Sequence, residues 1–407
     1  MENPSFGPIA SISVNEGARF NVEIPASAAP PVTRLEMQIA RGGQVSFSAV
    51  PWKVEDSKIE LDGTGSRLSL QEFEMKDFSL LEAKNGSAFE CGPVAFDDSQ
   101  FFVRGATATI GDLSVTGGGQ LFLFQGGRLI AQEAFLETGL FGIEESSTVQ
   151  LASLCVLKDA LLVVGEGSSI SGTLLSVDEG SKVRGSGTLR FLEVVKRGTI
   201  EPGNSPGTLT IDGDFEQAAG KVVLEIAGTR PEQQDHLVIT GDAKFTGGSI
   251  ELVFVDQFAP TAGQQFELIQ PAGAFVLPTS VPVTVRGLEP GWQFATAFDA
   301  ASGKWTVASL NDGVALPPPT VPESSFRIAS FAVQTQPDGT RLVSGTFTGG
   351  PTDTVVMLQS TTNLSDAGDW QSFGLLRLDE VGSGAFNGIE LPPGPAATFL
   401  RSRVLTP

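Results

Sequence analysis

Apolar residues recur every 20 positions along the middle of this 407-residue chain. One column of these residues contains Phe101, Leu121, Phe141 and Leu161. A second column lies two positions later and contains Val103, Leu123, Ile143 and Val163. Two is the side-chain period of a β-strand, and a fixed period of about 20 residues indicates a structure that stacks similar coils on one another.

Two further columns define the shape of each coil. One contains Leu68, Phe89, Leu129, Val149 and Ile170 with a gap at Thr109, and the other contains Val115, Phe135 and Cys155. Gly, Ser, Asp and Asn separate the apolar segments, so each period holds three short strands joined by turns. The pattern predicts an all-β chain, in which a right-handed parallel β-helix of about 20 residues per coil is followed by a small β-sandwich.

Two other folds share part of this pattern. A leucine-rich repeat has a similar period, but it has one strand per repeat and a buried Asn or Cys column, neither of which occurs here. An antiparallel sandwich with regularly spaced hairpins is the alternative to the β-helix. The segments that follow from the β-helix are a cap or assembly segment at 1–65, the β-helix at 66–315, a proline-rich linker at 316–324 and the sandwich at 325–407.

Two motifs in the second half of the β-helix carry a resemblance to a known family. The first is Gly-Thr-Ile-Glu-Pro-Gly-Asn-Ser-Pro-Gly at 198–207, and the second is Asp-His-Leu-Val-Ile-Thr-Gly at 235–241. With Trp292 and Trp305 they make residues 183–310 resemble the passenger-associated repeats of autotransporter-like secreted bacterial proteins. Gln234 stands where that family usually has an aromatic residue. The resemblance implies a secreted solenoid, and it implies no particular activity.

The C-terminal segment 325–407 reads as short strands. Residues 326–333 and 341–347 alternate around Pro337-Asp338-Gly339, which predicts a hairpin, and further strands are expected at 355–358, 370–378, 385–389 and 399–404. The run from Leu358 through Trp370 to Arg403 resembles the C-terminal fibronectin-type-III-like modules of large secreted bacterial proteins. We expect Trp370 in the core of this module, with carbohydrate stacking as its alternative role.

Charge and composition exclude several functions. The chain has 47 acidic and 26 basic side chains, a net charge of -21, which repels nucleic acid and anionic lipid. It has no apolar run of about 18 residues, so we expect no membrane insertion. One histidine and two cysteines leave little for a zinc, haem or iron–sulfur site, and neither calcium-binding repeat pattern occurs. We therefore expect no cofactor and no metal.

Candidate catalytic residues are few. Asp97-Asp98 is the neatest pair of aspartates, but the Gly-His-Gly and Arg-x-Lys motifs of a polygalacturonase-like site do not accompany it. Two carboxylates from adjacent coils could serve an inverting glycosidase, and the acidic residues considered for this are Glu72, Glu74, Glu133 and Glu137. We interpret them as solvated outward positions.

A hydrolytic triad is the other catalytic possibility. Residues 203–207 match Gly-x-Ser-x-Gly, and Asp235-His236 could supply the other two members. A nucleophile elbow needs a helix after the serine, whereas Pro206 and a strand-like segment follow here, so we interpret the match as a corner turn. We interpret His236 as a structural residue at a turn edge. The sequence thus predicts no catalytic, cofactor-binding or metal-ligating residue.

The cysteines and the chain ends bear on compartment and assembly. Cys91 and Cys155 lie about three coils apart, roughly 14 Å, which exceeds the reach of a disulfide, so two buried free thiols are expected. Residues 1–8 lack a secretory signal, which we take to have been removed from an extracellular or cell-surface protein. We expect a non-catalytic surface stalk, adhesin or filament subunit that associates end to end through strand edges, with Ile9–Ile24 as a candidate added strand. A polysaccharide-binding or polysaccharide-cleaving β-helix is the alternative.

Overall fold

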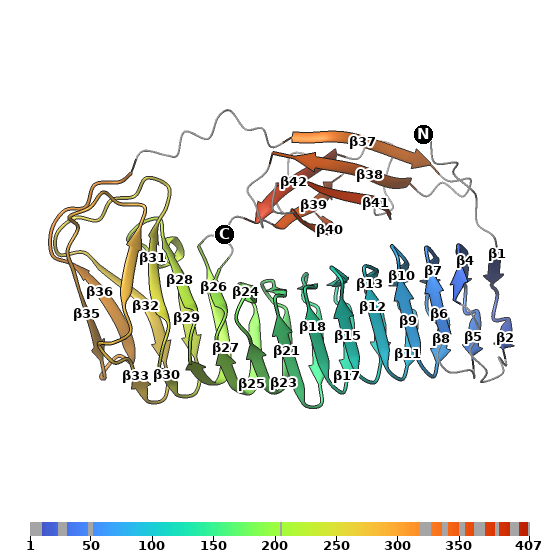
Figure 1. Ribbon diagram of the computed structural model, residues 1–407, viewed down its shortest axis with the longest axis horizontal. Helices are drawn as coiled ribbons and strands as arrows, with labels where there is room; N and C mark the ends of the chain where they lie inside the picture. Colours follow the sequence, from blue (N-terminus) through green and yellow to red (C-terminus); the bar gives the residue numbers. More distant parts are fainter. Residues whose placement is uncertain are drawn as a thin grey trace. The chain divides into compact units, whose positions relative to one another are not determined.

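The computed structural model describes residues 10–22, 31–47, 52–203, 206–316, 327–335, 341–349, 355–361, 371–378, 382–390 and 399–405. The chain divides into two compact units, Met1–Ala315 and Leu316–Pro407. The first unit is a parallel β-solenoid, whose coils follow one another in chain order (Figure 1). The predicted all-β fold with a parallel β-solenoid is confirmed, and small β-sheets occur in the segment where the sequence predicts a β-sandwich.

One face of the solenoid is a parallel sheet of 13 strands in the part of the chain that is described. Its strands, in spatial and chain order, are β1 (Ala10–Val14), β4 (Leu35–Ala40), β7 (Lys58–Asp62), β10 (Leu80–Lys84), β13 (Gln100–Arg104), β16 (Gln120–Phe124), β19 (Leu140–Ile143), β22 (Leu161–Val164), β24 (Lys182–Gly185), β26 (Thr199–Pro202), β28 (Lys221–Ile226), β31 (Ser249–Phe254) and β34 (Val283–Arg286).

The other two faces belong to one continuous second sheet. One face contains β2 (Arg19–Val22), β5 (Gln44–Phe47), β8 (Arg67–Leu70), β11 (Ala88–Cys91), β14 (Thr107–Thr109), β17 (Arg128–Ala131), β20 (Thr148–Leu151), β29 (His236–Ile239) and β32 (Gln265–Pro271). The other contains β3 (Val32–Thr33), β6 (Trp52–Glu55), β9 (Phe73–Lys76), β12 (Val94–Asp97), β15 (Leu113–Thr116), β18 (Ala134–Glu137), β21 (Leu154–Lys158), β30 (Ala243–Phe245) and β33 (Phe275–Val276). Between them, β23 (Ser169–Val177), β25 (Thr188–Lys196) and β27 (Thr208–Gln217) are single long strands that span both faces.

Alternate side chains of each strand point inward and form one continuous apolar core along the solenoid. Phe101, Leu121 and Phe141 stack in register, as do Val103, Leu123 and Ile143, so these predicted columns are confirmed. The fourth members are wrong by a single position. The coil from β19 to β22 is one position longer than the coil before it, so Leu162 and Val164 continue the columns while Leu161 and Val163 face the other side.

The other predicted columns are partly right. The gap at Thr109 closes because Ala108 pairs with both Phe89 and Leu129. The column of Val115, Phe135 and Cys155 is wrong, since Val115 continues into Leu136 and Leu157. Phe135 faces solvent, and Cys155 stacks on Ala134 in a separate inward column.

Strand pairing at the N-terminal end of the solenoid corrects the predicted cap at 1–65. Coil length also varies more at the two ends of the solenoid than in its middle. Ala10 pairs with Leu35, and Glu36 pairs with Lys58, in the same parallel register as later coils. The described part of residues 1–65 therefore belongs to the solenoid. Its period is hidden because paired residues here are 25 and 22 positions apart rather than 20.

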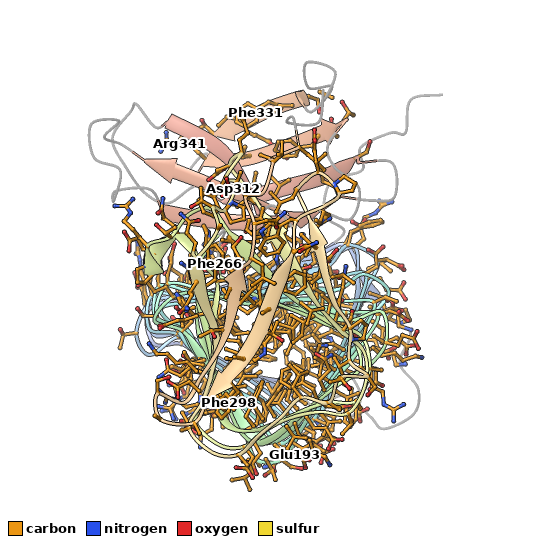
Figure 2. The ribbon with its side chains drawn as sticks, turned by 90° about the vertical axis from the view of Figure 1, so that its left-hand side faces the viewer. Glu193, Phe266, Phe298, Asp312, Phe331 and Arg341 are labelled. Carbon is orange, nitrogen blue, oxygen red and sulfur yellow. The ribbon has the colours of Figure 1, made fainter. Side chains whose placement is uncertain are left out.

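The C-terminal end of the solenoid departs from the parallel pattern. The hairpin of β35 (Phe294–Asp299) and β36 (Lys304–Ser309) pairs antiparallel with β32. Aromatic residues of the hairpin and of the segment before it pack against the last coils: Phe298 stacks on Phe275 with ring centroids 4.7 Å apart, and the ring centroids of Trp292 and Phe254 lie 4.9 Å apart. Figure 2 looks onto this end of the solenoid, where Phe266 and Phe298 are labelled. The hairpin extends one of the three faces beyond β32, while β33 and β34 are the last strands of the other two faces.

The second unit contains two antiparallel sheets of three strands each among its described residues. One has the order β37 (Arg327–Thr335), β38 (Arg341–Thr348), β41 (Gly384–Glu390), and the other has the order β40 (Gln371–Arg377), β39 (Val355–Thr361), β42 (Phe399–Leu405). The predicted hairpin is confirmed as β37 and β38. Trp370 and the residues of the predicted turn and linker, apart from Leu316, lie outside the described residues.

Candidate functional site

Asp235 is the buried carboxylate of the segment 235–241, and it holds the corner that precedes β27. Its two oxygens accept hydrogen bonds from the backbone amides of Gly207 and Glu225, each at 2.8 Å. Burial, which leaves the side chain 1% exposed, raises the pKa of Asp235 well above its usual range. Asp235 thus contacts the Gly-x-Ser-x-Gly segment and stabilises its corner through backbone hydrogen bonds.

His236 does not join Asp235 in a catalytic pair. Asp235 directly precedes β29 and is buried, whereas the side chain of His236, the first residue of β29, faces outward. Nε2 of His236 lies 2.9 Å from the carbonyl oxygen of Pro231. A triad needs the carboxylate to orient the imidazole, and here both groups bond to the backbone instead. Ser205 lies outside the described residues.

The carboxylates considered for a glycosidase are distributed along the solenoid. Glu74 lies on β9 and Glu137 on β18, three strand spacings apart, or roughly 14 Å. An inverting pair needs about 6.5–9.5 Å, so Glu74 and Glu137 do not form one. Glu72 lies beside Glu74, and Glu133 accepts a hydrogen bond from Ser153 at 3.1 Å.

Two of these four carboxylates, Glu74 and Glu137, have cationic partners, and so does Glu60 on β7. Hydrogen bonds from Lys53 and Lys76 lower the pKa of Glu74, whereas a general acid needs a raised pKa. Glu137 pairs with Lys158 on the next coil. Burial raises the pKa of Glu60, but Lys84 and Lys58 outweigh it and hold that pKa below its ordinary value.

Asp98, the second aspartate of the Asp97-Asp98 motif, has a raised pKa. Burial is the main cause, and the carboxylates of Asp77 and Asp97 add to it. Asp77 and Asp98 stand at equivalent turns of neighbouring coils, where each adopts a left-handed backbone conformation, with φ of 52° and 46°. Asp tolerates this conformation better than most residues. Asp77 and Asp98 therefore have a turn-forming role. The chain's single histidine lies many coils away from them.

A pocket of about 380 Å³ lies beside His236, at the junction of β29, β32 and β36. Its lining includes an ion pair between Glu267 and Lys304, and it is otherwise made by uncharged groups and the imidazole: Thr229, Pro231, Gln234, His236, Gln265, Ile269 and Gln270. Amides, a hydroxyl and an ion pair can bind a small polar ligand such as a sugar through hydrogen bonds. The lining holds one carboxylate, which is paired with Lys304, whereas a glycosidase needs two, so the pocket offers binding rather than cleavage of a sugar.

Sequence reasoning missed this pocket for two structural reasons. The coil that links Lys221 to Ser249 is longer than the coils in the middle of the solenoid, and its extra length brings the turn at 229–234 over the neighbouring strands. The reversal of β36 then places Lys304 beside Glu267. The strand alternation of His236 was the only signal in the sequence, since it predicts an outward imidazole.

Lys196 is a buried lysine that the sequence analysis did not single out. It is 0% exposed, and its Nζ donates to Oε1 of Gln217 at 3.0 Å and to the carbonyl oxygen of Ala219 at 3.3 Å. Burial lowers the pKa of Lys196 to about 7. Gln217 in turn donates to the carbonyl oxygens of Gly247 and Ser249, so the two side chains form a polar connection across successive coils.

The cysteines carry no reactive thiolate. Both are free, and burial raises the pKa of each to about 12. Cys155 is buried as expected, whereas Cys91 is only half-buried, because it ends β11 at a turn. Among the described residues no three His, Cys, Asp or Glu side chains converge on a metal-sized space. No helix in the described part of the chain is long and apolar enough to cross a bilayer.

Comparison with known proteins adds one structural likeness. No family model and no curated protein matches the sequence. The fold has a match in the crystal structure of the Haemophilus influenzae Hap adhesin, at 10% identity and a TM-score of 0.30. The match covers 73% of this chain and 43% of the adhesin chain, so this chain spans less than half of that protein's length. A likeness of this degree carries no functional argument, and the function must be inferred from the chain's own residues.

Proposed function

We propose that this chain is a non-catalytic, extracellular structural or adhesive protein, a surface stalk, adhesin or filament subunit built on a β-solenoid. The observation that carries the proposal is that charged side chains of neighbouring coils form ion pairs with one another. Glu74 and Glu137 pair with lysines of neighbouring coils, and the largely buried Glu82 pairs with Arg104 at 2.8 Å. These pairs stabilise the stacking of coils, and they engage Glu74 and Glu137, two of the carboxylates considered for a glycosidase, with lysines.

The extracellular location rests on the resemblance of residues 183–310 to passenger-associated repeats. Such repeats are found in secreted solenoids. A continuous core also suits a surface role, because coils added along one axis extend a side wall on which ligands can bind.

An activity assay separates this function from a polysaccharide-cleaving one. The full chain is incubated with pectin, homogalacturonan, xylan and bacterial capsular polysaccharide, and new reducing ends and unsaturated products are measured. We expect no turnover, and we expect beads coated with the chain to adhere to at least one immobilised surface when beads coated with heat-denatured chain do not. Turnover that Glu74→Gln or Glu137→Gln abolishes would show that the proposal is wrong.

Polysaccharide binding is the second candidate, and the pocket beside His236 favours it. Gln265 and Gln270 come from one strand, and each can present an amide to sugar hydroxyls. Affinity electrophoresis in gels containing each polysaccharide tests this function. We expect retardation of the wild type that Gln265→Ala with Gln270→Ala reduces at least fivefold. The control is Gln100→Ala with Gln120→Ala, two stacked glutamines distant from the pocket along the sequence and the coils.

A further inference from the structure

One edge of the strand β37 has no partner strand in the part of the chain that is described. Among the described residues it pairs only with β38, and it is the outermost strand of its sheet (Figure 1). It is nine residues long, and its only charged side chain is Arg327 at its first position. Residues 328–335 are all exposed. A long, uncharged edge of this kind offers unpaired N–H and C=O groups to another strand.

The core side of β37 is also incompletely covered. Ile328 and Val333 lie opposite Phe347 and Val343 of β38, which are buried, so the two rows share a face of the sheet. Phe331, which is labelled in Figure 2, lies in the same row, and strand pairing places it opposite Gly345. Yet Ile328, Phe331 and Val333 remain 50%, 46% and 47% exposed. A strand placed beside β37, with apolar residues alternating on the same face, would cover this row.

The net charges of the two units indicate which of them can contact a second copy of the chain. Residues 316–407 contain eight acidic and five basic side chains, a net charge of -3, so residues 1–315 carry the remaining -18. Two solenoid sides repel each other strongly, whereas two C-terminal units meet with little repulsion. The strand Arg327–Thr335 is itself an alternating, proline-free segment that is uncharged after its first residue, which is the chemistry that its own edge requires.

We propose that β37 is a homodimerisation edge, on which β37 of a second copy pairs antiparallel about a two-fold axis. The two-fold axis stands perpendicular to the sheet, so both apolar rows lie on the same face and cover one another. The product is a continuous sheet with the order β41-β38-β37-β37-β38-β41. The contact is about 30 Å long and narrow, so the dimer is weak and depends on concentration. The contact is independent of the adhesive function proposed above.

Sedimentation velocity on the full chain over a wide concentration range, at low ionic strength, tests the proposal. We expect a monomer–dimer equilibrium for the wild type, and at least a tenfold weaker association for Phe331→Lys, which places a charge in the apolar row. Ala332→Lys tests the edge from the other face of the strand and leaves the row intact. The matched control is Leu192→Lys, because Leu192 is 73% exposed on the solenoid. It should dimerise like the wild type.

Hydrogen exchange locates the contact. The amides of residues 328–335 should gain protection as the wild-type concentration rises, and this gain should be absent in Ala332→Lys. Circular dichroism confirms that each variant is folded. A wild type that stays monomeric overturns the proposal, as does association that both β37 variants retain. Growth beyond a dimer that both variants abolish overturns it too, because an isologous contact closes after two copies.

Discussion

Lys196 makes the stability of the solenoid depend on pH. Its pKa is about 7 in the folded chain and near 10.5 when unfolded, so between these values the unfolded chain binds a proton that the folded chain lacks. The free energy of unfolding should therefore rise with pH above pH 7. This rise is best measured below about pH 8.5. Above that pH, the raised pKa values of the two cysteine thiols make the free energy of unfolding fall as the pH rises, which opposes the effect of Lys196.

Urea unfolding at several pH values from 7 to about 8.5 measures this dependence. Lys196→Met should flatten the slope, because the titrating group is gone, although it also leaves Oε1 of Gln217 without its donor. Lys158→Met is the control, since Lys158 is exposed and its pKa is raised by Glu137, outside the window. Equal slopes for the wild type and Lys196→Met would show that the buried amine does not titrate there.

Ile143 tests the stacking of side chains in the core. It is 0% exposed and lies between Leu123 and Val164 of the neighbouring coils. Ile143→Asp should lower the free energy of unfolding by several kcal/mol, because it buries a carboxylate without a partner. Ile143→Val should cost only about 0.5–1.5 kcal/mol. A melting temperature for Ile143→Asp close to that of the wild type would refute the register.

At the scale of elements, β25 has a bulge where it pairs with β27, and Gly213 of β27 lies against this bulge. Its φ is +145°, and a Cβ atom there would lie 1.6 Å from the carbonyl oxygen of Phe191. Gly118 also has a positive φ, +84°, but a Cβ atom there would meet nothing within 4 Å. Gly213→Ala should therefore destabilise the chain by clearly more than Gly118→Ala, as thermal melting would show. Equal losses would mean that backbone strain alone matters at both sites.

The strands that sequence predicted well are those of coils with constant length. From β10 to β19 the spacing between paired strands does not change, so Phe101, Leu121 and Phe141 repeat visibly. One added residue before Leu161 was enough to assign it to the wrong face, since strand faces alternate. The reversal of β36 has no periodic signal at all, because it depends on contacts with β32 and β35.

The candidate site was predictable in its parts and not in its arrangement. Alternation continued back from β29 predicts that Asp235 and His236 face opposite ways, which agrees with the structural role predicted for His236. The partners of Asp235 come from residues 28 positions before it and 10 positions before it, across turns whose lengths no pattern fixes. The buried position of Lys196 was hidden by the bulge between Arg190 and Glu193, which shifts the inward positions of β25.

At the scale of the whole molecule, end-to-end association stays a prediction. The described part of β1 pairs on one side only, with β4, and β33 and β34 end two faces at the opposite end. A net charge of -21 opposes contact between copies, so association should strengthen with ionic strength. Light scattering in the Phe331→Lys background, which removes the β37 contact, measures this assembly separately.

Deletion of residues 1–30 should abolish that association, because it removes β1 and β2. Ser11→Lys with Ser13→Lys is the milder variant, since both residues are exposed on β1. Leu192→Lys again serves as the control for added charge. A Phe331→Lys chain that stays monomeric at high concentration and high salt would show that the solenoid ends do not join.

The unequal coils give the solenoid a mechanical signature. Hydrogen bonds between coils point along the solenoid axis, so a pull on its two ends loads the ladders in series, and the chain should unravel one coil at a time from an end. The coil from Lys182 to Thr199 is roughly half as long as the one from Ile250 to Val283. The corresponding gains in contour length are about 60 Å and about 110 Å. Under tension the molecule would thus lengthen in steps of unequal size, and their order would record the direction from which it yields.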